Sequence, residues 1–344
     1  MLKHFSNARG WRYDDKGDAI RVLVSTNIDL SPLRRSVSIA RFETKLLASG
    51  TPPYEMNPMT QSPPSFLVGL IGTGIRASRS PALHEHEASA QGVRYWYRLI
   101  DLDAHPSGSE TLSQLITAAE RMGFAGLNIT HPVKQAVIPL LTDLSDDAHA
   151  LGAVNTVVFR NGRRIGHNTD WWGFAQSFRR GLADARIEHI VQLGAGGAGA
   201  AVAHAALTLG ATRLDVFDLD AKRAERLAED LCNRFGADRA TAGTDLGAAM
   251  AQADGLIQAT PVGMADHPGL PLPAGLLRAA HWVAEIVYFP LETELLRTAH
   301  ELGCRTLDGG GIAVFQAAEA FRLFTGIAPD EQRMLDDFAA MSAG

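Results

Sequence analysis

From residue 66 onward, short apolar runs alternate with longer segments in which apolar residues recur every three or four positions. Short apolar runs bounded by turn residues are typical of buried strands, and the longer spacing is typical of amphipathic helices. Strands that alternate with helices predict an α/β fold. The predicted strands cover residues 66–72, 95–100, 124–129, a segment within 150–158, 190–193, 214–218, 255–259 and 282–287.

Helices are predicted between these strands. They begin at Pro81, Pro132 and Trp171, follow Gly199 as far as Leu209, and cover residues 112–122, 294–302 and 314–324. The pair Asn161-Gly162 predicts a tight hairpin turn.

The stretch from residue 124 to residue 141 is the centre of the pattern. A buried strand ends at Ile129, Thr130 follows it, and Pro132 is suited to the first turn of a helix that extends to Leu141. Lys134 then lies at a strand-to-helix turn, which is where open α/β sheets bind ligands. Taken alone, Lys134 is better explained as a solvated surface residue.

Other polar residues occupy equivalent loops. Ser78 and Ser80 lie two residues apart, so both hydroxyls can face one side of an extended loop, although turn formation or helix capping explains either one. Asn155 interrupts an apolar run, and a buried amide needs partners. Asp170 precedes a helix, which it could simply cap. We expect one cavity to collect Ser78, Thr130, Lys134, Asn155 and Asp170.

A glycine-rich loop follows the strand at 190–193. Its Gly194, Gly196 and Gly199 have the G-x-G-x-x-G spacing, which lets backbone N–H groups approach a pyrophosphate at a helix N-terminus. Asp218 ends the next strand about 20 residues on, where a carboxylate binds the adenosine ribose hydroxyls. We therefore predict dinucleotide binding, with NAD favoured over NADP because Asp218 repels a 2′-phosphate. Lys222 and Arg223 nearby keep NADP open as the alternative.

Composition argues against several classes of protein. The 344 residues are 46% hydrophobic and 20% charged, which is ordinary for a globular protein, and the net charge of −6 argues against a nucleic-acid partner. Cys232 and Cys304 form no disulfide framework or metal motif, and no apolar run is long enough to span a membrane. We expect a cytoplasmic protein without a metal. Residues 1–64 read as a mobile extension, with Met56 or Met59 as alternative starts.

Taken together, the motifs resemble the shikimate/quinate dehydrogenase family. The chain looks closest to the NAD-dependent actinobacterial quinate/shikimate dehydrogenases, notably at residues 218–220 and 321–326. It departs from the family pattern at Ala77 and Glu85, where the family commonly has His and Asn. The motifs that carry the resemblance are residues 78–81, 126–134, 152–156, 168–170, 194–199, 259–261 and 309–316.

The resemblance implies two domains separated by a cleft. Residues 65–169, completed by C-terminal helices at 310–340, would bind the substrate, and residues 170–309 would form a Rossmann-type NAD-binding domain. Lys134 and Asp170 would be the catalytic pair. The resemblance implies substrate contacts from Ser78, Ser80, Thr130, Lys134, Asn155, Asp170, Tyr288 and Gln316. It implies cofactor contacts from Gly194, Ala195, Gly196, Gly197, Ala198, Gly199, Asp218, Arg223, Thr260, Val287 and Gly309.

The implied reaction interconverts shikimate and 3-dehydroshikimate, and also quinate and 3-dehydroquinate. Hydride transfer to NAD leaves the hydroxyl proton to a base, and we expect burial and the helix start to favour the neutral amine of Lys134. A ligand sensor without catalysis, an aminoshikimate-type dehydrogenase and a methylene-tetrahydrofolate dehydrogenase are the alternatives, and the last leaves Ser78 and Ser80 unexplained. Either a monomer or a homodimer fits the sequence.

Overall fold

The computed structural model describes residues 11–13, 19–21, 63–105 and 109–342. The chain divides into one unit that ends at Thr60 and a second that begins at Gln61. In the first, β1 (Trp11–Tyr13) and β2 (Ala19–Arg21) pair antiparallel. The extension predicted for residues 1–64, with its alternative starts, otherwise lies almost wholly outside the described residues.

The second unit contains a mixed six-stranded sheet in the order β4-β3-β5-β7-β8-β6. Both neighbours of β3 run parallel to it, and β7 pairs antiparallel with β5 and β8. The β7–β8 hairpin turns at Asn161 and Gly162, which have φ angles of 54° and 72°, as the sequence predicted. The strands are β3 (Ser65–Gly72), β4 (Arg94–Asp101), β5 (Gly126–Ile129), β6 (Asp143–Leu144), β7 (Thr156–Arg160) and β8 (Arg163–His167).

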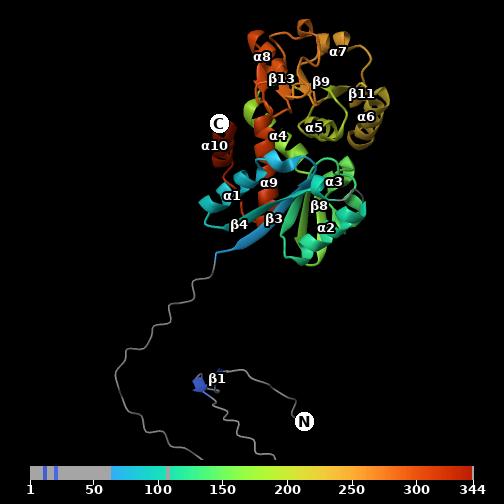
Figure 1. Cartoon of the computed structure of the whole chain (residues 1–344). Coiled ribbons are helices and arrows are strands. Elements are labelled where there is room, and N and C mark those ends of the chain that lie inside the picture. The colour runs from blue at the N-terminus through green and yellow to red at the C-terminus, as the bar shows by residue number, and fades with distance from the viewer. Residues whose placement is uncertain (1–10, 14–18, 22–62, 106–108, 343–344) are drawn as a thin grey trace, which may run out of the picture. The chain divides into compact units, whose positions relative to one another are not determined.

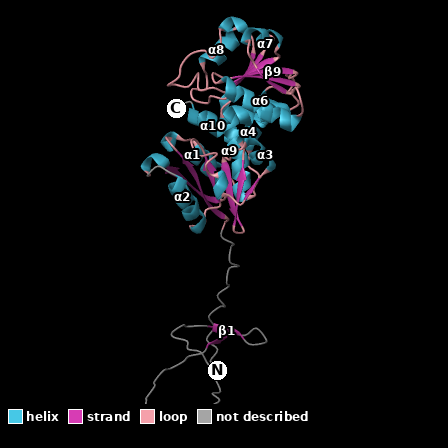
Figure 2. Ribbon diagram, turned by 90° about the vertical axis from the view of Figure 1, so that its right-hand side faces the viewer, coloured by secondary structure: helices cyan, strands magenta, loops and turns pink. Residues whose placement is uncertain are grey.

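A second six-stranded sheet is parallel throughout, in the order β11-β10-β9-β12-β13-β14. Renumbered from β9, this is the 3-2-1-4-5-6 order of Rossmann-type nucleotide-binding sheets. The two sheets confirm the predicted α/β class (Figure 2). The strands are β9 (His189–Leu193), β10 (Arg213–Phe217), β11 (Ala240–Ala242), β12 (Gly255–Gln258), β13 (Trp282–Glu285) and β14 (Arg305–Leu307).

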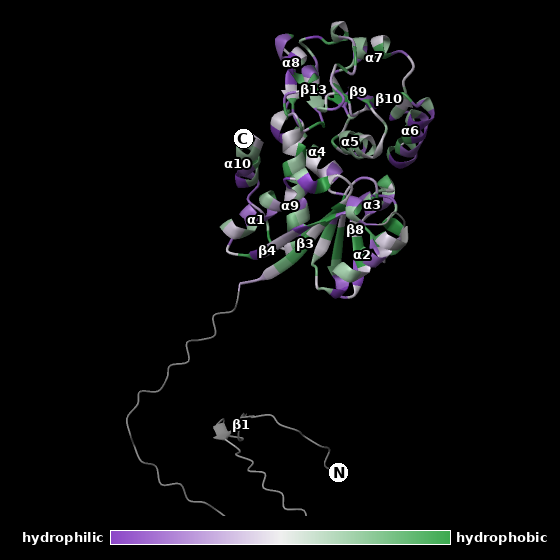
Figure 3. Ribbon diagram, in the orientation of Figure 1, coloured by the Kyte–Doolittle hydropathy of each residue, from purple (hydrophilic) through white to green (hydrophobic). Residues whose placement is uncertain are grey.

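Helices cover both faces of each sheet, so side chains from neighbouring positions of one strand enter different cores. Ile257 packs in the core under α5 and α6, whereas the preceding Leu256 packs with residues of α7 and α8. Figure 3 shows hydrophobic residues along α5 and hydrophilic residues over much of α6. These helices are α1 (Ser80–Ala90), α2 (Ser109–Arg121), α3 (Asp146–Leu151), α5 (Gly197–Thr208), α6 (Ala221–Phe235), α7 (Leu246–Gln252) and α8 (Glu294–Glu301).

Two further helices link the two sheets, and a third packs beside one of them. Helix α4 (Asp170–Gly181) contributes Phe174 and Phe178 to the core of the parallel sheet, and it packs along α9 (Gly309–Thr325). Helix α9 contributes Phe321 and Phe324 to the core beneath β3 and β4, and Figure 1 shows it between the two sheets. Helix α10 (Glu331–Ser342) packs on α1 and α9. Helix α9 begins at Gly309 rather than at the predicted residue 314.

The helix predicted from Pro132 to Leu141 is wrong. The segment forms turns and one 3₁₀ helix, Ile138–Leu140. The carbonyl of Lys134 accepts a hydrogen bond from Val154 N at 2.9 Å instead of one from its own segment, and Pro139 lacks the N–H that a helix needs there. Lys134 therefore does not lie at the start of an α-helix.

The crossing of α4 and α9 should not tolerate a side chain at Gly173. A Cβ there would lie 2.6 Å from Ile312 O and 2.9 Å from Gln316 N, which are backbone atoms with little freedom to move. We expect Gly173→Ala to lower the free energy of unfolding by about 1–3 kcal/mol in urea denaturation. Gly247→Ala in α7 is the control, because its Cβ would lie 3.4 Å from the nearest atom. Equal stability of the two variants would contradict this packing.

Candidate active site

Backbone hydrogen bonds hold the loop after β5 against the strand that leads into β7. Ile129 N donates to Asn155 O at 2.7 Å, and Val154 N donates to Lys134 O at 2.9 Å. Thr130 N donates to Ile71 O at 2.9 Å, which also attaches the loop to the end of β3. Lys134 is thus fixed through its backbone beside Asn155, although no helix supports it.

Lys134 and Asp170 form a close ion pair. Lys134 Nζ lies 2.6 Å from Asp170 Oδ2, and the two side chains are 27% and 23% exposed, so the pair is partly open to solvent. Asp170 is the first residue of α4, and its N–H donates to Asn168 Oδ1 at 3.1 Å. The alternative that Asp170 merely caps a helix is wrong, because its carboxylate binds side chains from other loops.

Asn155 completes this cluster. Its Nδ2 donates to Asp170 Oδ1 and to Thr169 Oγ1, both at 2.9 Å. Its Oδ1 accepts from Thr169 N at 2.7 Å. Asn155 is almost fully buried, and these bonds satisfy the amide and hold the other carboxylate oxygen of Asp170. Three of the five residues that the sequence predicted in one cavity therefore lie together.

Ser78 and Ser80 lie where the loop after β3 enters α1. Ser80 N donates to Ser78 Oγ at 3.3 Å. This bond is the turn formation that offers a simpler explanation of the two serines than substrate binding. The guanidinium of Arg79, between the two serines, lies 5.9 Å from the ring centroid of Phe289 in the loop after β13.

The other predicted substrate contacts come from separate elements. A Cβ on Gly72 would overlap Thr130, so β3 and the Lys134 loop approach closely there. Gln316 of α9 lies beside Gly173, which follows Asp170 by one turn of α4. The amide of Gln316 donates to Ala313 O of its own helix at 3.1 Å. Tyr288 is 54% exposed in the loop after β13.

The glycine loop is shaped by its lack of side chains. A Cβ on Gly194, where φ is +97°, would lie 2.5 Å from Ala259 O, and a Cβ on Gly199 would lie 2.3 Å from Gly194 O. Cβ atoms on Gly196 or Gly197 would meet open space. The buried side chain of Gln192 donates to the carbonyls of Gly194 and Gly199 at 2.8 and 2.9 Å. The loop therefore curls at its ends and leaves room outside its middle, at the start of α5.

Asp218 contacts this loop directly. Its Oδ2 accepts from Ala195 N at 2.8 Å, and its Oδ1 lies 3.7 Å from a guanidinium nitrogen of Arg223. A carboxylate against the glycine loop at the end of β10 fits the ribose of a dinucleotide whose pyrophosphate lies at the N-terminus of α5.

The remaining predicted cofactor residues follow strands of the same sheet. Thr260 Oγ1 accepts from Gln258 Nε2 at 2.7 Å and from Val262 N at 3.2 Å. A Cβ on Gly309 would lie 2.4 Å from Val287 O, so only glycine lets the start of α9 approach that loop. Ala198 lies in the first turn of α5.

Three polar residues inside strands were missed by the sequence reading. Tyr97 and Asn128 are buried, and Tyr97 Oη donates to Asn128 Oδ1 at 2.8 Å. Glu285 is fully buried at the end of β13. The signal was available, because Asn128 and Glu285 interrupt apolar runs just as Asn155 does.

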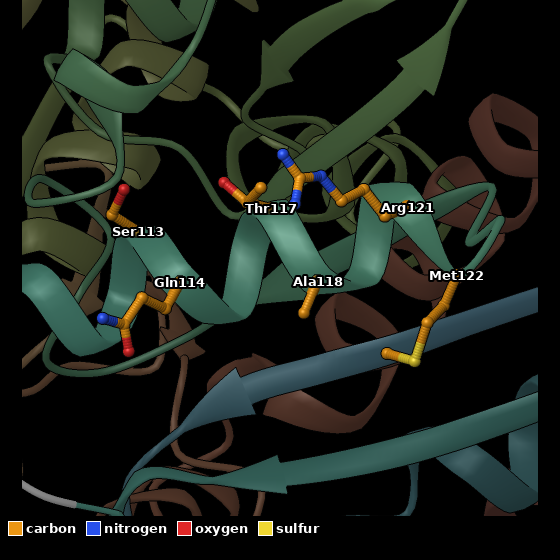
Figure 4. Close-up of a pocket in the computed structure, with 6 residues that line it drawn as sticks. All are labelled: Ser113, Gln114, Thr117, Ala118, Arg121 and Met122. Atoms are coloured by element: carbon orange, nitrogen blue, oxygen red, sulfur yellow. The ribbon is translucent and has the colours of Figure 1, made fainter.

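A separate hollow of about 410 Å³ lies on α2 (Figure 4). None of the residues that line it belongs to the predicted site. They are Ser113, Gln114, Thr117, Ala118, Arg121 and Met122. In the described part of the chain, no cluster of three His, Cys, Asp or Glu residues is suited to a metal ion. Among the same residues, no helix has the length and apolar character of a membrane span.

Two α/β sheets, a glycine loop with an acidic residue beside it, and an amine–carboxylate pair define an oxidoreductase that uses a nicotinamide dinucleotide. The family model described as the shikimate dehydrogenase substrate binding domain matches residues 70–157. A shikimate dehydrogenase (NADP(+)) of Streptomyces avermitilis is 62% identical over 286 residues, which cover 83% of this chain and 98% of that relative. The chain belongs to the shikimate dehydrogenase family, which confirms the resemblance predicted from the sequence.

The names of other relatives give NAD rather than NADP as the cofactor. A quinate/shikimate dehydrogenase (NAD(+)) of Corynebacterium glutamicum is 49% identical, over 80% of this chain and 99% of the relative. The solved structure of quinate dehydrogenase from Corynebacterium glutamicum in complex with NAD is similar, with a TM-score of 0.77 and 48% identity. It covers 80% of this chain and 99% of that one. The relatives thus support a nicotinamide dinucleotide in general.

Glu285 is the most perturbed acid of the parallel sheet. Burial raises its pKa from 4.5 to about 7, although bonds from Val287 N at 3.1 Å and Thr293 Oγ1 at 3.2 Å favour the charged form. The folded protein therefore holds a proton on Glu285 that the unfolded chain has lost. That proton stabilises the fold below pH 4.5, and its contribution is lost as the pH rises through about 7.

We therefore expect stability to depend on pH through this residue. Between pH 4.5 and 8, the free energy of unfolding of the native protein should fall by on the order of 3 kcal/mol relative to that of Glu285→Gln. Urea denaturation of both proteins at several pH values measures the difference, in which the contributions of other groups cancel. Parallel pH profiles would show that Glu285 does not titrate in this range.

Proposed function

We propose that this protein oxidises a ring hydroxyl of shikimate, and of quinate, and transfers the hydride to NAD. The observation that carries the proposal is the contact of 2.6 Å between Lys134 Nζ and Asp170 Oδ2, partly open to solvent beside the buried amide of Asn155. An amine and a carboxylate held together can bind one hydroxyl and exchange its proton. The family name of the relatives supplies the substrate class.

Lys134 is proposed to take the hydroxyl proton during oxidation and to return it during reduction. Its partial exposure gives that proton a route to water. Asp170 is proposed to orient the ammonium group and the substrate hydroxyl, and Asn155 keeps its carboxylate in place. The dinucleotide supplies the hydride acceptor. The helix start that was expected beside Lys134 is absent from the structure, so it has no part in the proposed mechanism.

The rest of the pocket is proposed from the resemblance and from the positions of the side chains. Ser78 and Ser80 would hold the substrate carboxylate, and Thr130, Asn155 and Gln316 would bind ring hydroxyls. The amide of Gln316 donates one N–H to Ala313 O, which leaves its second N–H and its carbonyl oxygen for the substrate. Tyr288 would line the pocket. Because quinate differs from shikimate by one hydroxyl and ring saturation, we expect activity on both.

We also propose the domain boundaries that the family implies. Residues 65–169 with the helices of 310–340 would form the substrate domain, and residues 170–309 would form the dinucleotide domain. The packing of Phe321 and Phe324 beneath β3 and β4 supports the assignment of α9 to the first domain. The cleft between the two domains remains a prediction.

NAD is proposed as the preferred cofactor. The carboxylate of Asp218 lies at the glycine loop, where it can accept hydrogen bonds from ribose hydroxyls and would repel a 2′-phosphate. The relative from Streptomyces avermitilis is named for NADP and the one from Corynebacterium glutamicum for NAD, so the names alone leave the choice open. The side chain of Asp218 favours NAD.

Substitution of Lys134 tests the catalytic role. We expect Lys134→Ala to reduce kcat by at least about 10²-fold, the usual cost of losing general acid–base catalysis, while NAD still binds. Lys134→Arg keeps the positive charge but cannot deprotonate, so it should lose a similar factor. Steady-state rates with shikimate and quinate, and titration of NAD by fluorescence, measure these effects. Nearly normal kcat in Lys134→Arg would exclude proton transfer by Lys134.

Substitution of Asp218 tests the cofactor choice. Asp218→Asn can still accept from Ala195 N, but it loses the charge that binds ribose hydroxyls and repels phosphate. We expect the ratio of kcat/KM for NAD to that for NADP to fall by roughly 10–100-fold. Glu225→Gln removes one charge from an exposed position of α6 and should leave the ratio unchanged. A native protein that prefers NADP would contradict the proposal.

A further inference from the structure

Arg79 joins the serine loop, residues 78–80, to the C-terminal helix. It is the last residue before α1, and its side chain reaches the final turn of α10, where Nη1 donates to Ser342 Oγ. Ser342 Oγ donates in turn to Phe338 O at 2.8 Å, which keeps its lone pairs available to Arg79. Helix α10 packs on α1, so the serine loop is attached to α10 at the start of α1 (Figure 1).

Two aromatic rings lie beside the same guanidinium. Arg79 Cζ is 5.5 Å from the ring centroid of Phe338 and 5.9 Å from that of Phe289. A guanidinium within about 6 Å of a ring centroid is attracted to the face of the ring. Phe289 follows β13 of the parallel sheet, whereas Arg79 follows β3 of the mixed sheet. The cation therefore bridges two loops that belong to different sheets.

Phe338 gives Arg79 a fixed partner. Its side chain is buried, and it belongs to a core with Leu83 of α1 and Val314 of α9. A Cβ on Gly310 would lie 3.2 Å from Phe338 Cε1, so the ring also lies against the first turn of α9. Phe289, in contrast, is 62% exposed. Arg79 thus connects a loop residue that is free to move with a ring that is held on three helices.

The charge of Arg79 is not cancelled by its partners. Among the described residues, no carboxylate forms an ion pair with Arg79, whereas Nε of Arg76 lies 3.4 Å from Asp101 Oδ2. Two rings and a hydroxyl hold the guanidinium without neutralising it. A positive charge beside two serine hydroxyls favours an anionic group at those hydroxyls.

We propose that Arg79 is a positioning residue for the carboxylate end of the substrate. By holding Phe289 and α10, it keeps the serine loop in the place where the hydroxyls of Ser78 and Ser80 meet one carboxylate. This rests on the proposed function and deepens it, because it makes binding of the anionic end depend on a contact between the two sheets. Arg79 acts through the two serines and not by contact with the reacting hydroxyl.

Substitution of Arg79 tests this role, with Arg76 as the matched control. Arg79→Met keeps a long apolar side chain but removes the guanidinium. We expect KM for shikimate to rise about tenfold, with kcat within about twofold of the native value, because substrate binding rather than proton transfer is weakened. KM for NAD should not change. Arg76→Met removes the same charge from a side chain that is 83% exposed, and it should leave all three constants within about twofold.

Substitution of Phe289 separates positioning from direct contact between Arg79 and the substrate. Phe289→Leu removes the ring and leaves Arg79 with its charge, and we expect KM for shikimate to rise about threefold. Phe289→Tyr restores a ring and should return KM to the native value. When Arg79→Met and Phe289→Leu are combined, KM should equal that of Arg79→Met alone, because both side chains act through one contact. Effects that multiply would contradict the proposal.

The carboxamide of shikimate tests whether the effect lies at the carboxylate end. This analogue keeps the ring hydroxyls, but hydrogen bonds to its neutral group are weaker than those to a carboxylate. Between the native protein and Arg79→Met, its KM should therefore rise by a clearly smaller factor than KM for shikimate. An equal rise for both compounds would place the effect elsewhere in the pocket and would contradict the proposal.

The outcomes distinguish the two proposals. A native protein that oxidises neither shikimate nor quinate, with NAD or NADP, contradicts the proposed function. An active native protein in which Arg79→Met and Arg76→Met have the same KM for shikimate contradicts the role of Arg79 alone. If Arg79→Met does not fold, the comparison rests on the exposed Phe289, and equal KM values in Phe289→Leu and Phe289→Tyr contradict that role.

Discussion

The backbone hydrogen bond from Val154 N to Lys134 O is the constraint on which the site depends. It joins two loops of the mixed sheet that are distant in sequence, and it takes the place of the helix that would otherwise hold Lys134. With the bond from Ile129 N to Asn155 O, it fixes the amine and the amide next to each other. Asp170 can then bind both, one with each carboxylate oxygen.

Asp170 also connects the two sheets. It begins α4, whose Phe174 and Phe178 belong to the core of the parallel sheet, whereas Lys134 and Asn155 come from the mixed sheet. The ion pair therefore joins residues whose backbones are supported by different cores. Helix α9 also joins the two sheets. Its first residue, Gly309, approaches Val287 after β13 of the parallel sheet, and its last turns pack beneath β3 and β4 of the mixed sheet. The proposed dinucleotide and substrate sites are thus fixed relative to each other by two crossing helices.

Much of this arrangement could be predicted from the sequence. The apolar runs predicted nearly all the longer strands, because buried strands of an α/β sheet are apolar on both faces. The glycine spacing predicted the tight loop before α5, because a Cβ on Gly199 would lie 2.3 Å from Gly194 O. The role of this loop and of Asp218 in binding a dinucleotide stays a prediction. Lys134, Asn155 and Asp170 were predicted to share one cavity, and the carboxylate of Asp170 contacts both of the others.

The failures have physical causes as well. Apolar spacing at 132–141 favoured a helix, but Pro139 and the bond from Val154 to Lys134 O exclude it. The predicted helix began only at residue 314, because glycine has a low helix propensity and three glycines stand at 309–311. In the structure the helix begins at Gly309, and Asp308 caps it by accepting from Gly310 N. Tyr97 could not be singled out, because a tyrosine in a strand is ordinary and Asn128, the partner of its hydroxyl, is distant in sequence.

A crystal structure of the protein with shikimate and reduced NAD, a combination that cannot react, tests the central claim most directly. The account predicts that Lys134 Nζ and a carboxylate oxygen of Asp170 both lie within hydrogen-bonding distance, about 2.6–3.2 Å, of one ring hydroxyl. The carbon that bears this hydroxyl should face the nicotinamide ring. A complex in which that hydroxyl contacts neither residue would contradict the account.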